Sequence, residues 1–144
     1  MQKGLDYTGI SIVFFCHNGK GKYLLSKRST NCRDEHGRWD PGGGALEFDA
    51  SIDETLRREI KEEYCADVIE YEHFGFLDVH RTLNGKPTHW VALLYKVLVD
   101  PKQVRNGEPH KFDAIDWFSL DELPTPLHSQ FPAVLKKYSK QLVQ

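Results

Sequence analysis

Several features that would assign this chain to a special class of protein are scarce or missing. Its three cysteines, Cys16, Cys32 and Cys65, are an odd number, lie far apart and form no CxxC pair. A disulfide framework and a zinc knuckle are therefore not expected, and a reducing, cytoplasmic environment fits best. The first residues lack the apolar run of a signal peptide, and no apolar stretch approaches the roughly 20 residues that span a bilayer. We expect no membrane partner.

Strong charge of one sign is missing as well. The net charge is −2 and no basic tract stands out, which argues against duplex nucleic acid as a partner. Free nucleotides remain compatible with this charge, because a local cluster suffices to bind them. With 40% hydrophobic and 28% charged residues, the 144-residue chain has the composition of an ordinary soluble protein. We expect one domain over residues 1–144, monomeric or homodimeric.

Strand-like and helix-like segments alternate along the chain. The apolar patterns predict strands at 9–15, 23–28, 73–83, 89–99 and 115–120, with Asn84-Gly85 as the turn of a hairpin. Residues 29–45, which are polar and glycine-rich, and 104–114 are predicted to be loops. The segment "SLDELP" is predicted to form a helical turn. Strands on both sides of one central helix indicate an α+β fold, an α/β/α sandwich with a mixed sheet flanked by helices.

Two helices are predicted. The first runs from Ser51 to about Tyr64, because Ser51 and Glu54 have the spacing of a capping box. The second covers residues 132–142, where Val134, Leu135 and Leu142 are among the apolar positions of a closing helix.

The first helix carries three carboxylates, Glu59, Glu62 and Glu63, within about one turn, where like charges repel. At about 100° per residue, Glu63 falls between Ile52 and Leu56 on the helical wheel. Glu59 also continues this apolar stripe, and Glu62 lies at its border. An acidic helix surface paired with nearby lysines and arginines is one interpretation. The other is a divalent-cation site, because inward-facing carboxylates need compensation and their oxygens suit a hard ion such as Mg²⁺.

The residues before this helix favour the cation site. In "PGGGALEFDAS" (Pro41–Ser51), glycines allow the backbone to approach a ligand closely. The segment Gly44–Ala66, 23 of 144 residues, resembles the Nudix box, G-x5-E-x7-R-E-U-x-E-E-x-G-U, where U is a bulky aliphatic residue. Gly44 matches the first glycine, Arg58-Glu59 the RE pair, and Glu62-Glu63 the EE pair. The flanking segments "LLSKR" and "EPHKFDAIDWFSLDELP" are also similar to Nudix proteins.

Three positions depart from the box. Ala50 stands at the first glutamate, Cys65 at the last glycine and Ala66 at the last aliphatic residue. The resemblance implies that the missing glutamate would support the box arginine, so its loss predicts weaker metal binding or slower turnover. Asp49 or Glu47 could supply a carboxylate to Arg58 instead. A glycine after a helix often adopts a left-handed conformation, so Cys65 predicts either backbone strain or a different exit from the helix.

The resemblance implies a Mg²⁺-dependent hydrolase, with Mn²⁺ as a substitute, that cleaves a nucleoside diphosphate linked to another group by attack of water on phosphorus. Glu59, Glu63 and Glu62 are the predicted metal ligands, which would neutralise phosphate charge and orient water. The general base is left open between Glu62 and Glu108, with Asp113 behind them. The predicted catalytic residues are Glu62, Glu108 and Arg58, and the predicted substrate-binding residues are Arg28, Glu47, Gly43 and Gly44.

Other residues are candidates for contacts with the phosphate or the base of a nucleotide. Arg28, Arg33 and His36 could contact phosphate but could equally be solvated surface charges. The aromatic candidates for stacking on a base, which could equally be core residues, are Trp39, Phe76, Trp90 and Trp117. We interpret His80, His89 and His110 as scattered polar positions. A Nudix-fold nucleotide-binding or sensor protein with weak or lost turnover is the alternative function, and a purely structural acidic helix leaves the glycine loop unexplained.

Overall fold

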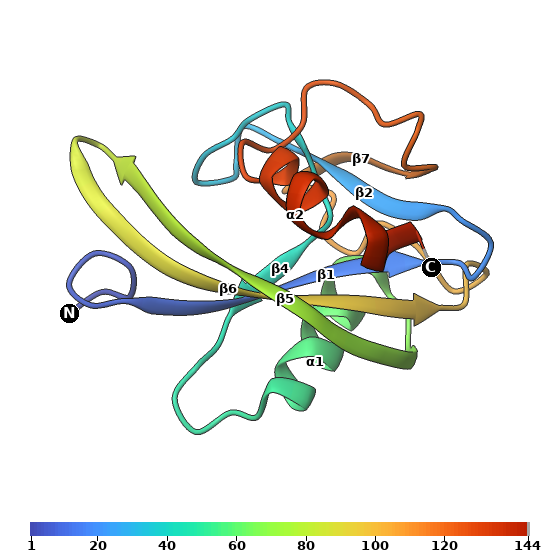
Figure 1. Ribbon diagram of the computed structural model, residues 1–144, viewed down its shortest axis with the longest axis horizontal. Helices are drawn as coiled ribbons and strands as arrows, with labels where there is room; N and C mark the ends of the chain where they lie inside the picture. Colours follow the sequence, from blue (N-terminus) through green and yellow to red (C-terminus); the bar gives the residue numbers. More distant parts are fainter. Residues whose placement is uncertain (144) are drawn as a thin grey trace.

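The computed structural model describes residues 1–143 and forms a mixed seven-stranded sheet with one helix on each face (Figure 1). This arrangement confirms the predicted α+β fold with a sheet flanked by helices. In chain order the elements are β1 (Gly9–His17), β2 (Tyr23–Arg28), β3 (Trp39–Asp40), β4 (Gly43–Ala45), α1 (Ile52–Tyr64), β5 (Val68–Leu83), β6 (Lys86–Val99), β7 (Phe112–Phe118) and α2 (Phe131–Val143).

Strand β1 is the centre of the sheet and separates two apolar cores. It pairs in parallel with β6 and antiparallel with β4 and β2. Its side chains alternate between the faces: Ile12 and Phe14 pack with α1, whereas Phe15 packs with α2. Because both faces of β1 are covered, its sequence is almost continuously apolar instead of alternating.

Helix α1 begins as the sequence predicted. The Ser51 hydroxyl accepts a hydrogen bond from the Glu54 backbone N–H at 3.0 Å, and the helix ends at Tyr64. Its buried residues are Thr55, Leu56, Ile60, Glu63 and Tyr64. The stripe of the helical wheel therefore faces the core, with a carboxylate among its apolar members.

Of the two alternatives for Cys65, backbone strain and a different exit from the helix, the structure shows the strained conformation. Cys65 caps α1 in the left-handed region, at φ 61° and ψ 17°, and its N–H donates to the Lys61 carbonyl at 3.0 Å. Left-handed backbone costs a residue with a Cβ about 1–2 kcal/mol. We expect Cys65→Gly to be about 0.5–1 kcal/mol more stable than Cys65→Ala in urea unfolding, after the greater unfolded-state entropy of glycine is deducted. If Cys65→Gly is instead less stable than Cys65→Ala, by the roughly 0.5–1 kcal/mol that glycine's entropy costs, the conformation carries no strain.

The predicted elements exist, but several boundaries were wrong. Strands β5 and β6 are longer than predicted and form the hairpin whose turn residues, Asn84 and Gly85, both have positive φ. Residues 29–45 contain the short strands β3 and β4, which the loop prediction missed because pairing with β2 and β1 outweighs the turn-forming composition. At residues 119–124 the predicted turn is present as a single hydrogen-bonded turn, in which the Glu122 N–H donates to the Ser119 carbonyl at 3.1 Å.

Two further observations concern the cysteines and the helices of residues 1–143. All three cysteines are free thiols. No helix in this part of the chain is both long enough and apolar enough to cross a membrane.

Candidate active site

A pocket of about 620 Å³ opens where β1 and β2 separate. These strands pair at His17↔Tyr23 and diverge from there (Figure 1). Carboxylates line one part of the pocket: Asp40, Glu59, Glu62, Glu63 and Glu108. Apolar side chains from the α2 face of the sheet line another part: Phe15, Leu77, Val79, Trp90, Ala92 and Leu94.

Glu63 is the most unusual carboxylate of the pocket. Its residue is 7% exposed. Burial raises the pKa of the Glu63 carboxyl well above its usual value, and the negative charges of Asp40, Glu59 and Glu108 raise it further, against the opposing effect of Lys111. A carboxylate in this setting is ionised only at a cost unless positive charge is added. The inward orientation predicted from the helical wheel is therefore observed.

Glu59 and Glu62 lie on the same turn as Glu63 but are less buried. Burial raises the pKa of Glu59, the charge of Glu62 raises it further, and Arg58 lowers it. Glu62 is exposed at the pocket edge. Among the described residues 1–143, no three of these carboxylates bring ligand atoms within 4.8 Å of one another. The mutual repulsion of these carboxylates, the raised pKa values of Glu59 and Glu63, and the oxygen donors fit a hard divalent cation, although the side chains would have to converge further around it.

The glycine loop packs directly against these glutamates. A Cβ added at Gly44 would lie 2.7 Å from Glu59 Cδ, and one at Gly42 would lie 2.6 Å from the Phe14 ring and 3.1 Å from Glu63 Oε1. A Cβ at Gly43 would lie 2.4 Å from the Ile12 carbonyl oxygen. The three glycines therefore have different reasons to lack a side chain. Gly43 permits the pairing of β4 with β1, Gly44 leaves room for Glu59, and Gly42 leaves room for the Phe14 ring and the Glu63 carboxylate.

Tyr64 holds this loop from the helix side, a role that the sequence reading missed. Its buried hydroxyl donates to the Pro41 carbonyl at 2.8 Å and lies 3.3 Å from Ser26 Oγ. The sequence signal for this role was the position of the tyrosine, directly after the Glu62-Glu63 pair, in a helix that follows a predicted glycine loop.

The loop before β7 contacts the C-terminal end of α1 and places Glu108 in the lining of the pocket. The Gly107 N–H donates to the Glu63 carbonyl at 2.9 Å, and a Cβ on Gly107 would lie 2.1 Å from the Glu62 carbonyl oxygen. Glu108, one of the two leading candidates for the base, thus follows a glycine in contact with the helix terminus. Asp113 is exposed and does not belong to the pocket lining.

Arg58 has no strong carboxylate partner. It is half-exposed, and Glu59 Oε1 lies 3.6 Å from its Nη2. Glu47 is ion-paired with Lys3 outside the pocket, so it does not replace the missing box glutamate. Asp49 is exposed, with φ at 64°.

Arg28 lines the pocket, but its guanidinium is already engaged. It lies 3.2 Å from Asp34 and 3.3 Å from Asp40. Its Nε also donates to the Asp34 carbonyl at 3.0 Å. These contacts tie β2 to the following loop, and a phosphate contact by Arg28 stays a prediction.

Two cationic residues of the pocket were missed in the sequence. Lys111 lowers the pKa of both Glu59 and Glu63 by its charge. Arg81 lies 3.0 Å from Asp34 and 3.3 Å from Glu35. Their positions along the chain are unremarkable, and only pairing of β5 and β7 with their neighbours brings them to the pocket.

The remaining candidates are aromatic residues and two residues of the loop after β2. Of the aromatic residues, Trp90 lines the pocket, whereas Trp39 packs against Phe118 and Trp117 against the core on the α1 side. Phe76 is 50% exposed and lies beneath Lys137. Arg33 reaches the pocket lining, and His36 Nε2 lies 2.6 Å from the Cys32 carbonyl oxygen.

Comparison with known protein families matches the NUDIX domain over residues 8–140, nearly the whole chain. The chain belongs to the Nudix family. It is 27% identical to the MutT Nudix hydrolase of Burkholderia pseudomallei, over 92% of this chain and 99% of that one, with a TM-score of 0.80. It is 25% identical to the MutT protein of Methanosarcina mazei Go1, over 95% and 96% of the two chains, with a TM-score of 0.74.

A third Nudix structure shares the fold alone. The NUDIX domain of Shewanella oneidensis NrtR, determined in complex with ADP ribose, is 17% identical over 99% of this chain and 90% of that domain. Its TM-score is 0.69. The family assignment confirms the resemblance drawn from the box, despite Ala50, Cys65 and Ala66.

Proposed function

We propose that this Nudix protein is a Mg²⁺-dependent hydrolase that cleaves a diphosphate linkage in a nucleotide or nucleotide derivative. The observation that carries the proposal is the buried carboxyl of Glu63, surrounded by Asp40, Glu59 and Glu108 in a pocket of about 620 Å³. So much negative charge in a partly apolar pocket calls for a cation.

Glu59, Glu63 and Glu62 would hold the cation, with Mn²⁺ as a substitute for Mg²⁺. When bound, it would neutralise phosphate charge and activate a water molecule. The backbone at Gly43 and Gly44 would let the diphosphate approach, and Lys111 would add positive charge beside it. Glu62 or Glu108 would accept the proton of the attacking water, and Arg58 would orient Glu59.

The apolar wall of the pocket is suited to the nucleoside. Leu77, Val79 and Trp90 present a mostly apolar surface from β5 and β6. Planar bases bury their faces against such side chains. The Shewanella oneidensis NrtR domain was solved with ADP ribose, which supports a nucleotide diphosphate as the class of ligand.

Metal dependence is the first test. We expect the protein to release phosphate or pyrophosphate from at least one member of a panel of nucleotides and nucleotide conjugates with Mg²⁺ or Mn²⁺. Turnover should vanish in EDTA and return when excess Mg²⁺ is added. Full turnover by metal-free protein in chelator would overturn the mechanism.

A nucleotide-binding sensor is the second candidate, favoured by the weak support of Arg58. Ala50 offers no carboxylate, and Glu47 is ion-paired elsewhere. In the sensor, no member of the panel would be hydrolysed, but nucleotides would bind in a metal-dependent manner.

Restoring the missing glutamate tests the importance of that support. We expect Ala50→Glu to strengthen Mn²⁺ binding by up to about tenfold, as outer-sphere partners of metal ligands do, measured by isothermal titration. Ala50→Gln is the control of equal size without charge. If Ala50→Glu binds Mn²⁺ no better than Ala50→Gln, another group already supports Arg58.

A further inference from the structure

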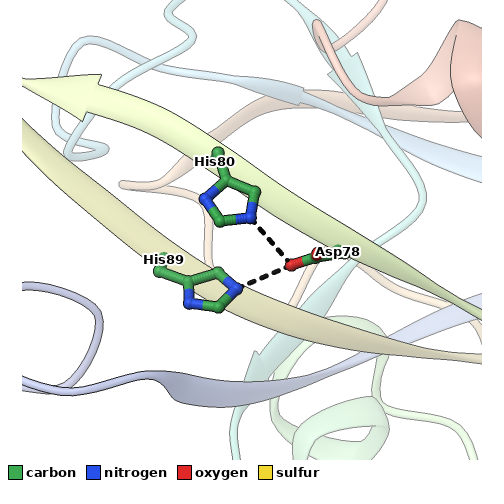
Figure 2. A group of neighbouring side chains, drawn as sticks. All are labelled: Asp78, His80 and His89. Atoms are coloured by element: carbon green, nitrogen blue, oxygen red, sulfur yellow. Dashed lines mark hydrogen bonds and ion pairs between the residues drawn. The ribbon is translucent and has the colours of Figure 1, made fainter.

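Three side chains with metal-binding atoms meet on the β5–β6 hairpin, away from the Nudix box. Asp78 and His80 belong to β5 and His89 to β6, and their ligand atoms all lie within 4.8 Å of one another (Figure 2). Two of the three were expected to be scattered polar residues. That expectation was wrong, because it took no account of the register between the strands.

Strand geometry brings the three residues to one face. Asp78 and His80 are two positions apart, so their side chains point the same way. His80 is directly opposite His89 in the antiparallel pair. The two imidazoles stack with centroids 4.1 Å apart and planes 15° from parallel.

The donor atoms converge on one oxygen. Asp78 Oδ1 lies 3.1 Å from His80 Nε2 and 2.6 Å from His89 Nε2, as drawn in Figure 2. Zinc bonds to nitrogen and oxygen are about 2.0–2.2 Å long, so ligand atoms around a tetrahedral zinc ion are about 3.3 Å apart. All three side chains are at least 38% exposed and can make this small adjustment.

The ring nitrogen of His89 that faces away from the cluster has a hydrogen-bond partner, as is typical of a metal-bound histidine. Nδ1 of His89 lies 2.8 Å from Thr8 Oγ1, and the His89 backbone N–H donates to the Gly4 carbonyl at 2.8 Å. When Nε2 binds a metal, the ring proton resides on Nδ1 and can be donated to the Thr8 hydroxyl. The N-terminal segment thus holds the ring in a suitable orientation.

The cluster lies on the opposite face of the hairpin from the nucleotide pocket. Leu77 and Val79, the alternate residues of β5, line the pocket, so Asp78 and His80 face the other way. A cation held here would not belong to the box carboxylates.

We propose that Asp78, His80 and His89 form a second metal site, which binds a borderline divalent cation of the Zn²⁺ type. Two imidazoles and one carboxylate suit Zn²⁺, whereas Mg²⁺ prefers oxygen ligands alone. Three protein ligands leave a position for water, and the metal joins the two strands of the hairpin. The hairpin cluster and the box carboxylates therefore select different metals, because one offers nitrogen ligands and the other offers oxygen alone.

The experiment is Zn²⁺ titration of the full-length protein at neutral pH in millimolar Mg²⁺, which occupies the box carboxylates. We expect one Zn²⁺ per chain by calorimetry. In histidine NMR spectra of the wild-type protein, the resonances of His80 and His89 should move before those of the other histidines. Asp78→Asn, His80→Gln and His89→Gln should each weaken binding by at least about tenfold, and Thr8→Val by about tenfold.

His73→Gln is the matched control, because His73 is an exposed histidine of the same strand outside the cluster. It should bind Zn²⁺ as the wild type does. The proposal is overturned if the His80→Gln, His89→Gln double variant binds Zn²⁺ as tightly as wild type, or if Zn²⁺ moves other histidines first. The proposal is also overturned if His73→Gln lowers the affinity for Zn²⁺ as much as the substitutions in the cluster do. The wild-type NMR titration decides the question even if a variant fails to fold.

Discussion

Glu63→Gln is expected to lower turnover at least about a hundredfold while the protein stays folded. Glutamine keeps the size and much of the hydrogen-bonding capacity of glutamate but removes the charge that would hold the cation. Charge neutralisation by a metal at a reacting phosphate is worth several kcal/mol, and each 1.4 kcal/mol corresponds to a factor of ten in rate. Steady-state kinetics over a Mg²⁺ titration, on the substrate found in the panel, measure the effect.

The same variant should lose a pH dependence of stability. In metal-free wild type, the raised pKa of Glu63 means that the folded state binds its proton more tightly than the unfolded state. Stability should therefore fall as the pH rises from the unfolded pKa of about 4.3 through the raised folded pKa. Chemical unfolding in EDTA at several pH values should show this fall in wild type and a flatter profile in Glu63→Gln.

Glu54→Gln is the control on the same helix, because Glu54 is exposed in the first turn. Its rate should stay near that of wild type and its stability within about 0.5 kcal/mol. If Glu63→Gln keeps turnover within about twofold of wild type at subsaturating metal, Glu63 is not a ligand.

Alanine at two adjacent glycines should separate stability from activity. A Cβ at Gly43 would meet the Ile12 carbonyl oxygen at 2.4 Å, and neither backbone can move without disrupting the β1–β4 pair. We expect Gly43→Ala to lower the free energy of unfolding by about 1–3 kcal/mol, the usual range for overpacking. Urea unfolding of the metal-free protein measures it.

Gly44→Ala should act on the site instead. Its Cβ would meet Glu59 at Cδ and Cγ, near the end of a flexible side chain that can rotate away. The fold should therefore lose less stability than in Gly43→Ala, but displacement of Glu59 should weaken Mn²⁺ binding and reduce turnover by about tenfold or more. If Gly44→Ala is as active as wild type, or less stable than Gly43→Ala, the contact with Glu59 has been misassigned.

Much of the site was predictable because it depends on local periodicity. Glu63 could be placed on the inward stripe of α1 from the helical repeat alone, and Ser51 could be recognised as its N-cap. The glycines before the helix and the RE and EE pairs were sufficient to predict the family. The N-terminal strand, the long hairpin and its Asn84-Gly85 turn follow from composition in the same way.

What the sequence determined by itself, then, is the two helices and the longer strands, the Nudix box and the inward orientation of Glu63. The tertiary structure decided which distant residues join them. Lys111 and Arg81 reach the pocket, Tyr64 binds the Pro41 carbonyl, and His80 meets His89 across two strands. The reason is physical: helical and strand repeats relate residues a few positions apart, whereas strand pairing and register depend on the packing of the whole sheet.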